Sequence, residues 1–299
     1  MWHAIAPPPG ARYTAAVSRI EDLILEQDRR GISALRPFLP PDYCRLAARF
    51  IQDHPGPAII TTGFYIRTAG VAETDGPPGA IAIGRALQSQ GRQVTYVSDR
   101  YGVPHLSPEQ TRGAKVVDFP IAGAEESRAY ADKLLAEFQP GLVISIERCG
   151  ASRDGLYRNM RSLDITEQTA RVDFLFKDAL ATIGIGDGGN EIGMGNVYDE
   201  VVRVPSLVPD PAATRVSRLL IASVSNWGGY GLASALSLLA KRDLLLTAEE
   251  EAVIVQAMVA RGAVDGISGE NKPYVDGFPP EVSGKLIDGL HTLISDGLR

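Results

Sequence analysis

The most constraining feature of this sequence is an alternation between short apolar runs, rich in β-branched residues, and segments long enough to form helices. Apolar runs without a polar face are typical of parallel strands that are buried on both sides. We therefore predict an α/β fold: a doubly wound, mainly parallel sheet with helices on both faces, in a Rossmann-like three-layer sandwich. The predicted strands are residues 57–66, 92–99, 114–120, 141–147, 181–187 and 218–227.

Helical periodicity and capping signals predict the helices between these strands. Two further helices are expected to begin at capping boxes, at Ser107 and at Thr247. A Gly/Pro-rich loop from about residue 263 leads into a last helix. Helices within about residues 14–52 are expected to pack on the sheet, and we predict a single domain over residues 1–299. The other predicted helices are residues 78–91, 125–140, 165–180 and 228–243.

Composition excludes several classes of protein. The chain has 299 residues, 44% of them hydrophobic, and a formal net charge of −6, which offers nucleic acid or an anionic membrane no electrostatic attraction. No apolar run is long enough to span a bilayer, and the first residues lack the pattern of a secretory signal. Cys44 and Cys149 are too few for a disulfide framework or a cysteine zinc site. We expect a cytoplasmic protein that acts on a small molecule, and we leave a homodimer open.

Polar residues and glycines gather where the predicted strands end, whereas the strand entrances carry simple turns. In parallel α/β sheets the carboxyl ends of the strands form one edge, and ligands bind there. We therefore predict the functional site at this edge. The stretches concerned are residues 61–63 with Glu73 and Asp75, then 98–100, 147–148, 187–191 and 226–227.

The stretch GIGDGGNEIGMGN, residues 184–196, follows the fifth predicted strand and sets Asp187, Asn190 and Glu191 among six glycines. A flexible turn would account for the glycines alone. Glycine also lets backbone N–H groups approach a ligand closely. Carboxylate and amide oxygens are hard ligands that suit Mg²⁺ or Mn²⁺ rather than zinc. We predict that this loop contributes to a divalent metal site.

The other polar stretches each have a structural alternative. Glu73 and Asp75 are as consistent with capping of the next helix as with a contact to substrate or metal. Glu147 and Arg148 could form an ion pair at a strand end, but their position favours a base beside a carboxylate clamp. For Asn226, helix capping is at least as consistent as contact with substrate.

Several enzyme classes lack support in the sequence. There is no P-loop and no G-x-G-x-x-G after the first predicted strand, so we expect no nucleotide cofactor. No G-x-S-x-G or H-E-x-x-H motif occurs, and among the histidines only His105 comes near a strand exit. The candidate chemistry therefore rests on carboxylates and arginines.

Several stretches together resemble the C-terminal domain family of D-glutamate cyclase: PAIITTGFYI, AETDGPPGA, SIERCGASRDGLYRNM, DIT, IGIGDGGNEIGMGN and SVSNWGGYGL. The resemblance covers about residues 20–295. It implies a hydro-lyase that converts D-glutamate to 5-oxo-D-proline and water. In the larger members of the family this domain follows an additional N-terminal domain, and we expect a stand-alone, bacterial-type member without it.

The reaction implied by this resemblance needs a base for the α-amine, stabilisation of a tetrahedral oxyanion, and release of a carboxylate oxygen as water. A metal would polarise the γ-carboxylate. A non-catalytic module that binds a small anion or an amino acid at the same edge is the alternative. The expected catalytic residues are Glu147, Glu73 and Asp75; the expected metal ligands are Asp187, Glu191 and Glu147; and the expected substrate contacts are Thr62, Gly63, Arg148, Gly188, Asn190 and Asn226, with Arg148 as the carboxylate clamp.

Overall fold

The computed structural model describes residues 19–299, so residues 14–18 of the first predicted helical segment lie outside the described residues. Its centre is a six-stranded sheet in which every pairing is parallel and the strand order is β5-β4-β1-β6-β7-β8. In chain order this is 3-2-1-4-5-6, the doubly wound arrangement in which ligands bind at the switch point between the first and fourth strands. The strands are β1 (Ala58–Thr62), β4 (Val94–Ser98), β5 (Lys115–Asp118), β6 (Leu142–Ile146), β7 (Thr182–Gly186) and β8 (Arg218–Ile221).

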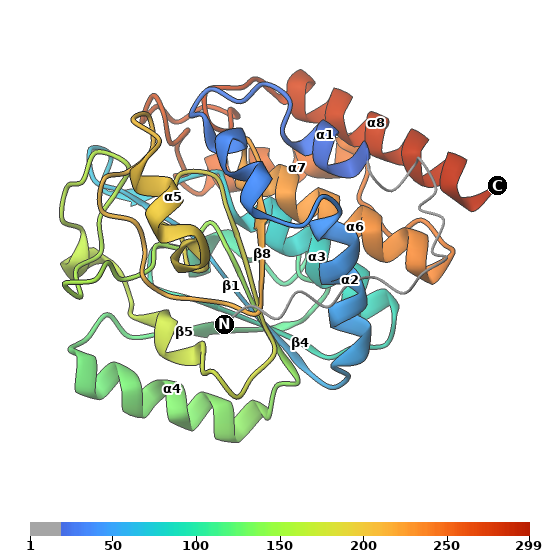
Figure 1. Cartoon of the computed structure of the whole chain (residues 1–299). Helices are drawn as coiled ribbons and strands as arrows, with labels where there is room; N and C mark the ends of the chain where they lie inside the picture. Colours follow the sequence, from blue (N-terminus) through green and yellow to red (C-terminus); the bar gives the residue numbers. More distant parts are fainter. Residues whose placement is uncertain (1–18) are drawn as a thin grey trace.

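Helices cover both faces of this sheet, which confirms the predicted fold class. On one face, α3 (Pro77–Ser89) and α6 (Ser225–Ala240) pack on the strands beside α2 (Tyr43–Asp53), and α4 (Ala124–Phe138) lies on the opposite side (Figure 1). A further layer packs around α6 and α3, formed by α1 (Arg19–Ile24), α7 (Ala248–Ala260) and α8 (Pro280–Leu298). The remaining short elements are α5 (Tyr198–Val202), the ribbon β2 (Tyr65–Ile66) with β3 (Val71–Ala72), and the 3₁₀ turns η1 (Ile32–Phe38), η2 (Val103–His105), η3 (Thr166–Gln168), η4 (Val172–Leu175) and η5 (Met194–Val197).

Most of the strands could be predicted from the sequence because they are buried on both faces and therefore consist mainly of apolar residues. Every residue of β1, β4, β6 and β7 is buried, as expected for parallel strands between two helical layers. The capping box at Thr247 is also confirmed: its hydroxyl accepts from the Glu250 N–H, and the Glu250 carboxylate accepts from the Thr247 N–H. No helix within residues 19–299 has the length and apolar character needed to cross a membrane.

Two predictions in the first part of the sheet were wrong: the end of the first strand and the helix expected from Ser107. The strand predicted over residues 57–66 ends at Thr62, because Gly63 takes a φ of 101° and turns the chain into the ribbon β2–β3. The helix predicted from Ser107 does not form. The Ser107 hydroxyl accepts weakly from the Gln110 N–H at 3.4 Å, but Arg112 and Gly113 both have positive φ and end the turn.

The helix predicted over residues 165–180 was also wrong, because tertiary hydrogen bonds replace helical ones there. Only the two 3₁₀ turns η3 and η4 form. The Asp173 carboxylate accepts from the N–H of Ala151 and the hydroxyls of Tyr157 and Thr214, which belong to other loops. The carbonyl of Ala170 accepts from the Arg148 guanidinium. Apolar periodicity alone does not reveal this competition.

Two helices meet closely through glycine at the centre of the fold. A Cβ added at Gly229 on α6 would lie 2.7 Å from Cα and 2.9 Å from the carbonyl oxygen of Gly79 on α3. Both atoms belong to backbone, so a side chain at Gly229 forces the helices apart. By contrast, a Cβ at Gly284 on α8 would make only an ordinary 3.6 Å contact with Ala248.

These two glycines give a matched pair of substitutions. We expect Gly229→Ala to lower the free energy of unfolding by about 1–3 kcal/mol, because overpacking outweighs the gain in helix propensity. Gly284→Ala should leave stability unchanged or raise it by about 1 kcal/mol or less. Urea denaturation of the two variants measures both effects. Equal stabilities for the two variants would contradict the close packing of α3 on α6.

Candidate active site

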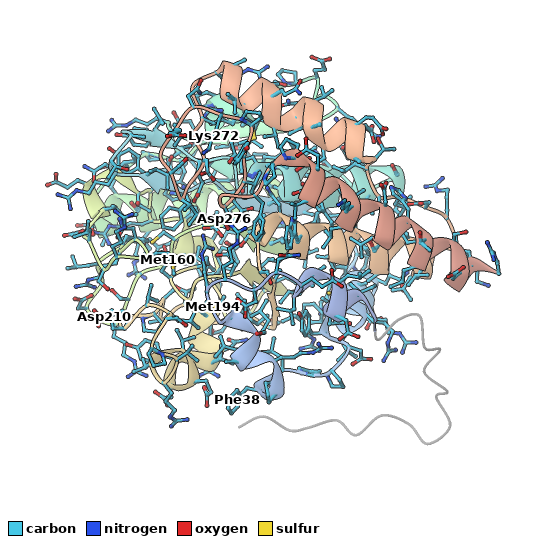
Figure 2. The ribbon with its side chains drawn as sticks, turned by 90° about the horizontal axis from the view of Figure 1, so that it is seen from above. Phe38, Met160, Met194, Asp210, Lys272 and Asp276 are labelled. Atoms are coloured by element: carbon cyan, nitrogen blue, oxygen red, sulfur yellow. The ribbon has the colours of Figure 1, made fainter. Side chains whose placement is uncertain are left out.

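Six buried carboxylates gather at the carboxyl edge of the sheet, and each is at most 6% exposed. They come from the loop before α3, the exits of β6 and β7, and the loop between α7 and α8. Figure 2 shows Asp276, from that last loop, near the centre of the molecule. The six are Glu73, Asp75, Glu147, Asp187, Glu191 and Asp276.

Ser225, the first residue of α6, binds three of these carboxylates at once. Its N–H donates to Asp75 at 2.9 Å and to Asp187 at 3.0 Å, and its hydroxyl donates to Glu147 at 2.6 Å. One oxygen from each of these three acids lies within 4.8 Å of the other two. Sequence reasoning missed Ser225, although it stands next to Asn226 at the exit of β8.

Asp75 and Asn226 cap each other's helices. Asp75 lies just before α3, yet its carboxylate accepts from the N–H groups of Ser225 and Asn226 at the start of α6. In return, the Asn226 side-chain oxygen accepts from the N–H groups of Gly76 and Gly79 at the start of α3, at 2.9 and 2.8 Å. Helix N-termini carry unsatisfied donors and partial positive charge, so they stabilise a buried carboxylate between them. Helix capping, the structural alternative for both residues, therefore occurs: Asn226 caps α3, and Asp75, which precedes α3, caps α6.

Arg30 brings positive charge into the cluster from outside the sheet. Its guanidinium pairs with Asp187 and, at 2.6 Å, with Asp276. The helical pattern predicted around Arg30 stops earlier, at Ile24, and a loop follows in which the Asp28 carboxylate accepts from successive N–H groups, including that of Arg30. This loop directs Arg30 inward, and neither Arg30 nor Asp276 was predicted as part of the site.

Burial raises the pKa values of Glu73, Asp75, Glu147, Asp187 and Asp276, and repulsion from neighbouring carboxylates adds to the shifts. The pKa values of Glu73, Asp75 and Glu147 lie well above their usual range. Burial raises the pKa of Asp187 to about 6 and that of Asp276 to about 8, although Arg30 opposes both shifts. Near neutral pH the cluster therefore holds protons or attracts a cation.

The donor set fits a divalent cation with a preference for oxygen. Asp75, Glu147 and Asp187 are buried and converge, and carboxylate oxygens suit Mg²⁺ or Mn²⁺. Glu191 does not belong to this convergent set. Its carboxylate instead accepts from the N–H groups of Asp187, Gly188 and Gly189, at 3.4, 2.8 and 2.8 Å, and so shapes the glycine-rich loop that presents Asp187.

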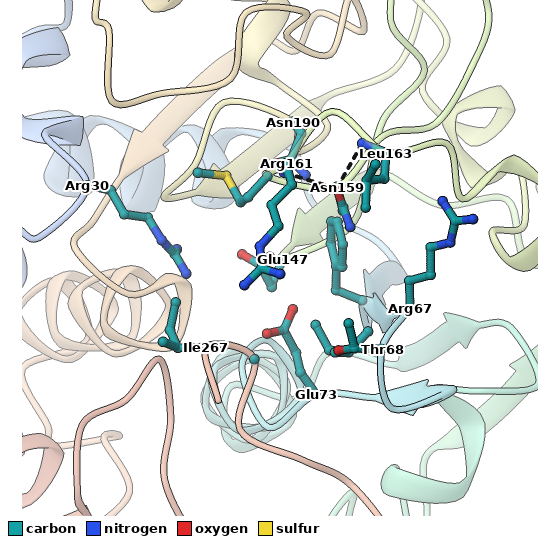
Figure 3. Close-up of a pocket in the computed structure, with 14 residues that line it drawn as sticks. Arg30, Arg67, Thr68, Glu73, Glu147, Asn159, Arg161, Leu163, Asn190 and Ile267 are labelled. Carbon is teal, nitrogen blue, oxygen red and sulfur yellow. Dashed lines mark hydrogen bonds between the residues drawn. The ribbon is translucent and has the colours of Figure 1, made fainter. Parts of the chain in front are cut away.

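A cavity of about 160 Å³ opens above the cluster (Figure 3). At roughly 15 Å³ for each enclosed water, this volume holds about ten waters, comparable to the non-hydrogen atoms of one small amino acid. Glu73 and Glu147 line it, and Glu73 makes no side-chain hydrogen bond within residues 19–299. The other lining residues are Arg30, Phe64, Ile66, Arg67, Thr68, Asn159, Met160, Arg161, Leu163, Asn190, Gly266 and Ile267.

Of the predicted substrate contacts, Asn190 lines the cavity. Its Nδ2 donates to the Arg158 carbonyl at 2.9 Å, and its buried Oδ1 has no partner among the described residues. Thr62 and Gly63 lie deeper, at the end of β1, and Asn226 is occupied in capping α3. The Gly188 N–H, expected to face an oxyanion, donates to Glu191 instead.

Arg148 was predicted as a carboxylate clamp, but it lies 2% exposed below the cavity. Its guanidinium pairs with Asp99 at 2.5 Å and donates to the carbonyls of Gly63 and Ala170. It thereby ties the exits of β1, β4 and β6 to the segment around η4. The neighbouring Glu147 takes a φ of 42°, which is uncommon for a residue other than glycine and turns the two side chains to different surroundings.

Comparison with known proteins identifies the family of this chain. The sequence profile described as D-glutamate cyclase-like, C-terminal matches residues 20–291. The human protein named D-glutamate cyclase, mitochondrial, is 35% identical over 267 residues, covering 79% of this chain and 42% of its own length. The chain therefore belongs to the D-glutamate cyclase-like C-terminal family, and it spans about two fifths of the length of that curated relative.

Two solved structures match this chain at low sequence identity and low TM-score. A putative oxidoreductase from Escherichia coli K-12 is 16% identical with a TM-score of 0.31, over 62% of this chain and 70% of that one. An actinorhodin polyketide ketoreductase variant with NADPH is 14% identical with a TM-score of 0.29, over 83% of this chain and 93% of that one. Neither likeness carries an argument about the function of this chain.

The contacts of Glu191 predict that it stabilises the loop without any metal. Glu191→Gln puts an N–H donor where the backbone N–H groups need an acceptor, so we expect the free energy of unfolding to fall by about 2 kcal/mol. Urea denaturation with EDTA present measures this, with the exposed Glu167→Gln as control. Unchanged stability together with lost Mn²⁺ binding would favour the metal-ligand role predicted from the sequence.

The raised pKa of Asp276 predicts a pH-dependent stability. Between about pH 4, where a free aspartate ionises, and about pH 8, the folded protein keeps a proton that the unfolded chain has released. Stability therefore falls as pH rises through this window. Asp276→Asn keeps an acceptor for Arg30 but does not ionise, so the fall in Tm between pH 5 and pH 8.5, with EDTA present, should be smaller by a few degrees. Exposed Asp53→Asn is the control, and parallel curves for all three proteins would contradict the prediction.

Proposed function

We propose that this chain is a hydro-lyase that cyclises D-glutamate to 5-oxo-D-proline and water, assisted by Mg²⁺ or Mn²⁺ and without a nucleotide. Membership of the D-glutamate cyclase-like family supports the reaction class. The observation that carries the proposal is the cavity itself: it is faced by a buried Glu73, which has no hydrogen-bond partner among residues 19–299, beside the three convergent carboxylates. A cytoplasmic location and a homodimer stay predictions.

The proton balance of the reaction suits a cavity rich in carboxyl groups. The substrate ammonium loses two protons, the amine nitrogen bonds to the γ-carboxyl carbon, and one carbon–oxygen bond breaks. Both protons leave on the departing oxygen as water. A carboxyl group that gains and loses a proton near neutral pH can take protons from nitrogen and return them to oxygen.

Glu73 is our choice for this proton carrier. Its carboxylate faces the cavity without a hydrogen-bond partner in the described part of the chain. Burial raises its pKa well above the usual range, and the neighbouring Asp276 and Asp75 add to the shift. Asp75 itself accepts three backbone hydrogen bonds, so its carboxylate is less available for proton transfer than that of Glu73.

Asp75, Glu147 and Asp187 are the residues that would hold the cation, and Ser225 fixes their relative positions. When bound, a divalent cation supplies positive charge that polarises a carboxylate and stabilises an oxyanion. Arg30 neutralises part of the charge on Asp187 and Asp276. The Asn190 Oδ1 is placed to accept a hydrogen bond from the substrate ammonium.

The test is turnover of D-glutamate by the purified chain, first stripped with EDTA and then supplied with Mn²⁺ or Mg²⁺, with 5-oxoproline followed by chromatography. We expect metal-dependent product, and we expect Glu73→Gln to lower kcat by about 100-fold or more. Glu125→Gln, at an exposed position on α4, should turn over as the wild type does.

A second measurement separates the cation site from the proton carrier. Glu147→Gln should weaken Mn²⁺ binding at least tenfold in isothermal titration calorimetry, whereas Glu73→Gln should bind Mn²⁺ nearly as the wild type does. Tight binding of D-glutamate without product would favour the small-molecule binding module. Full activity of the EDTA-treated chain would contradict the assistance by metal.

A further inference from the structure

Apart from Arg30, which is paired with Asp187 and Asp276, the charged side chains that line the cavity are separated by depth. Glu73 and Glu147, at its floor, are 5% and 6% exposed, whereas the arginines at its mouth, Arg67 and Arg161, are exposed. Buried acids at the floor attract an ammonium group or a cation. Exposed guanidinium groups at the mouth attract a carboxylate. The floor of the cavity thus favours a positively charged group of a bound amino acid, and the mouth favours a carboxylate.

The Arg161 side chain is directed into the cavity and binds no acceptor in the described part of the chain. In Figure 3 its side chain extends toward Glu147, while the guanidinium of Arg67 points away from both acids. Neither side chain makes a hydrogen bond or an ion pair within residues 19–299. An arginine whose donors face a cavity and have no protein acceptor is suited to bidentate binding of a carboxylate.

The loop that carries Arg161 is fixed to the site, so its position is defined. The Asn159 Oδ1 accepts from the N–H groups of Arg161 and Leu163, both at 3.0 Å. The Arg158 carbonyl, three residues before Arg161, accepts from the Asn190 side chain at 2.9 Å. The mouth of the cavity is therefore tied directly to the loop that contains Asp187.

We infer that Arg161 binds the α-carboxylate of the substrate and thereby restricts the substrates to amino acids whose α-carboxylate is free. The inference rests on the proposed function, because cyclisation brings the amine and the γ-carboxylate together over the floor acids. The α-carboxylate is the one charged group of the substrate that this arrangement leaves without a partner, and the exposed arginines at the mouth are the charged groups of the cavity that can bind it. Arg161 thus takes the role that the sequence predicted for Arg148, whose two terminal guanidinium nitrogens are bound by Asp99 and by the carbonyls of Gly63 and Ala170.

The experiment compares D-glutamate with D-isoglutamine, its α-amide, which keeps the amine and the γ-carboxylate. Wild type should prefer D-glutamate by about 10- to 100-fold in kcat/KM, through KM more than kcat. Arg161→Gln should raise KM for D-glutamate and bring this preference close to one, and Arg161→Lys should restore part of it. Arg49→Gln, at an exposed position on α2, should keep the kcat, the KM and the substrate preference of the wild type.

Binding of the two ligands by calorimetry gives a readout that does not depend on turnover. If wild type binds without product, loss of the preference in Arg161→Gln still supports the inference while the proposed function fails. If turnover is present and Arg161→Gln keeps the KM and the preference of the wild type, the inference is overturned and the proposed function stands. Failure of wild type to bind D-glutamate overturns both.

Discussion

The site depends on the exchange of caps between α3 and α6. Each helix begins beside the other, their backbones touch at Gly79 and Gly229, and the donors at each N-terminus are satisfied by a side chain from the other's start. Because Asp75 and Asn226 perform this exchange, a carboxylate is buried where two helix dipoles stabilise negative charge. Ser225 lies at the same point, and it positions Glu147 and Asp187 as a consequence.

The cluster contains more negative charge than its surroundings neutralise. Burial, together with repulsion that the helix N-termini and Arg30 offset only in part, raises the pKa values of Glu73, Glu147 and Asp276. An assembly of this kind destabilises the fold when it is fully ionised, and it becomes favourable when it binds protons or a cation. The repulsion that lowers stability is therefore the same property on which the proposed proton transfer depends.

Parallel topology made much of the site predictable. The exits of β1, β6 and β7 had to share one edge, so Glu73, Asp75, Glu147 and Asp187 could be grouped before their contacts were known. What failed was the assignment of partners. Arg148 and Glu191 stand at the right edge, but their side chains bind protein groups that a sequence pattern does not identify. Arg30 and Asp276 were missed because they come from loops outside the strand exits, where only tertiary packing brings them to the site. Arg161 does follow β6, but it stands fifteen residues beyond the end of that strand, and only the fold of the intervening loop brings it back to the cavity.

The pairing of Arg30 with Asp276 joins residues that are 246 positions apart. Arg30 leaves the ribosome before any strand of the sheet, and Asp276 leaves it after all six strands and after α3 and α6. All residues of the sheet and of its central helices are therefore synthesised before Asp276, and until then Arg30 lacks one of its two carboxylate partners. The order in which the chain is made thus keeps the charged centre incomplete during synthesis, so a growing polypeptide carries the scaffold of the site before it carries the whole site.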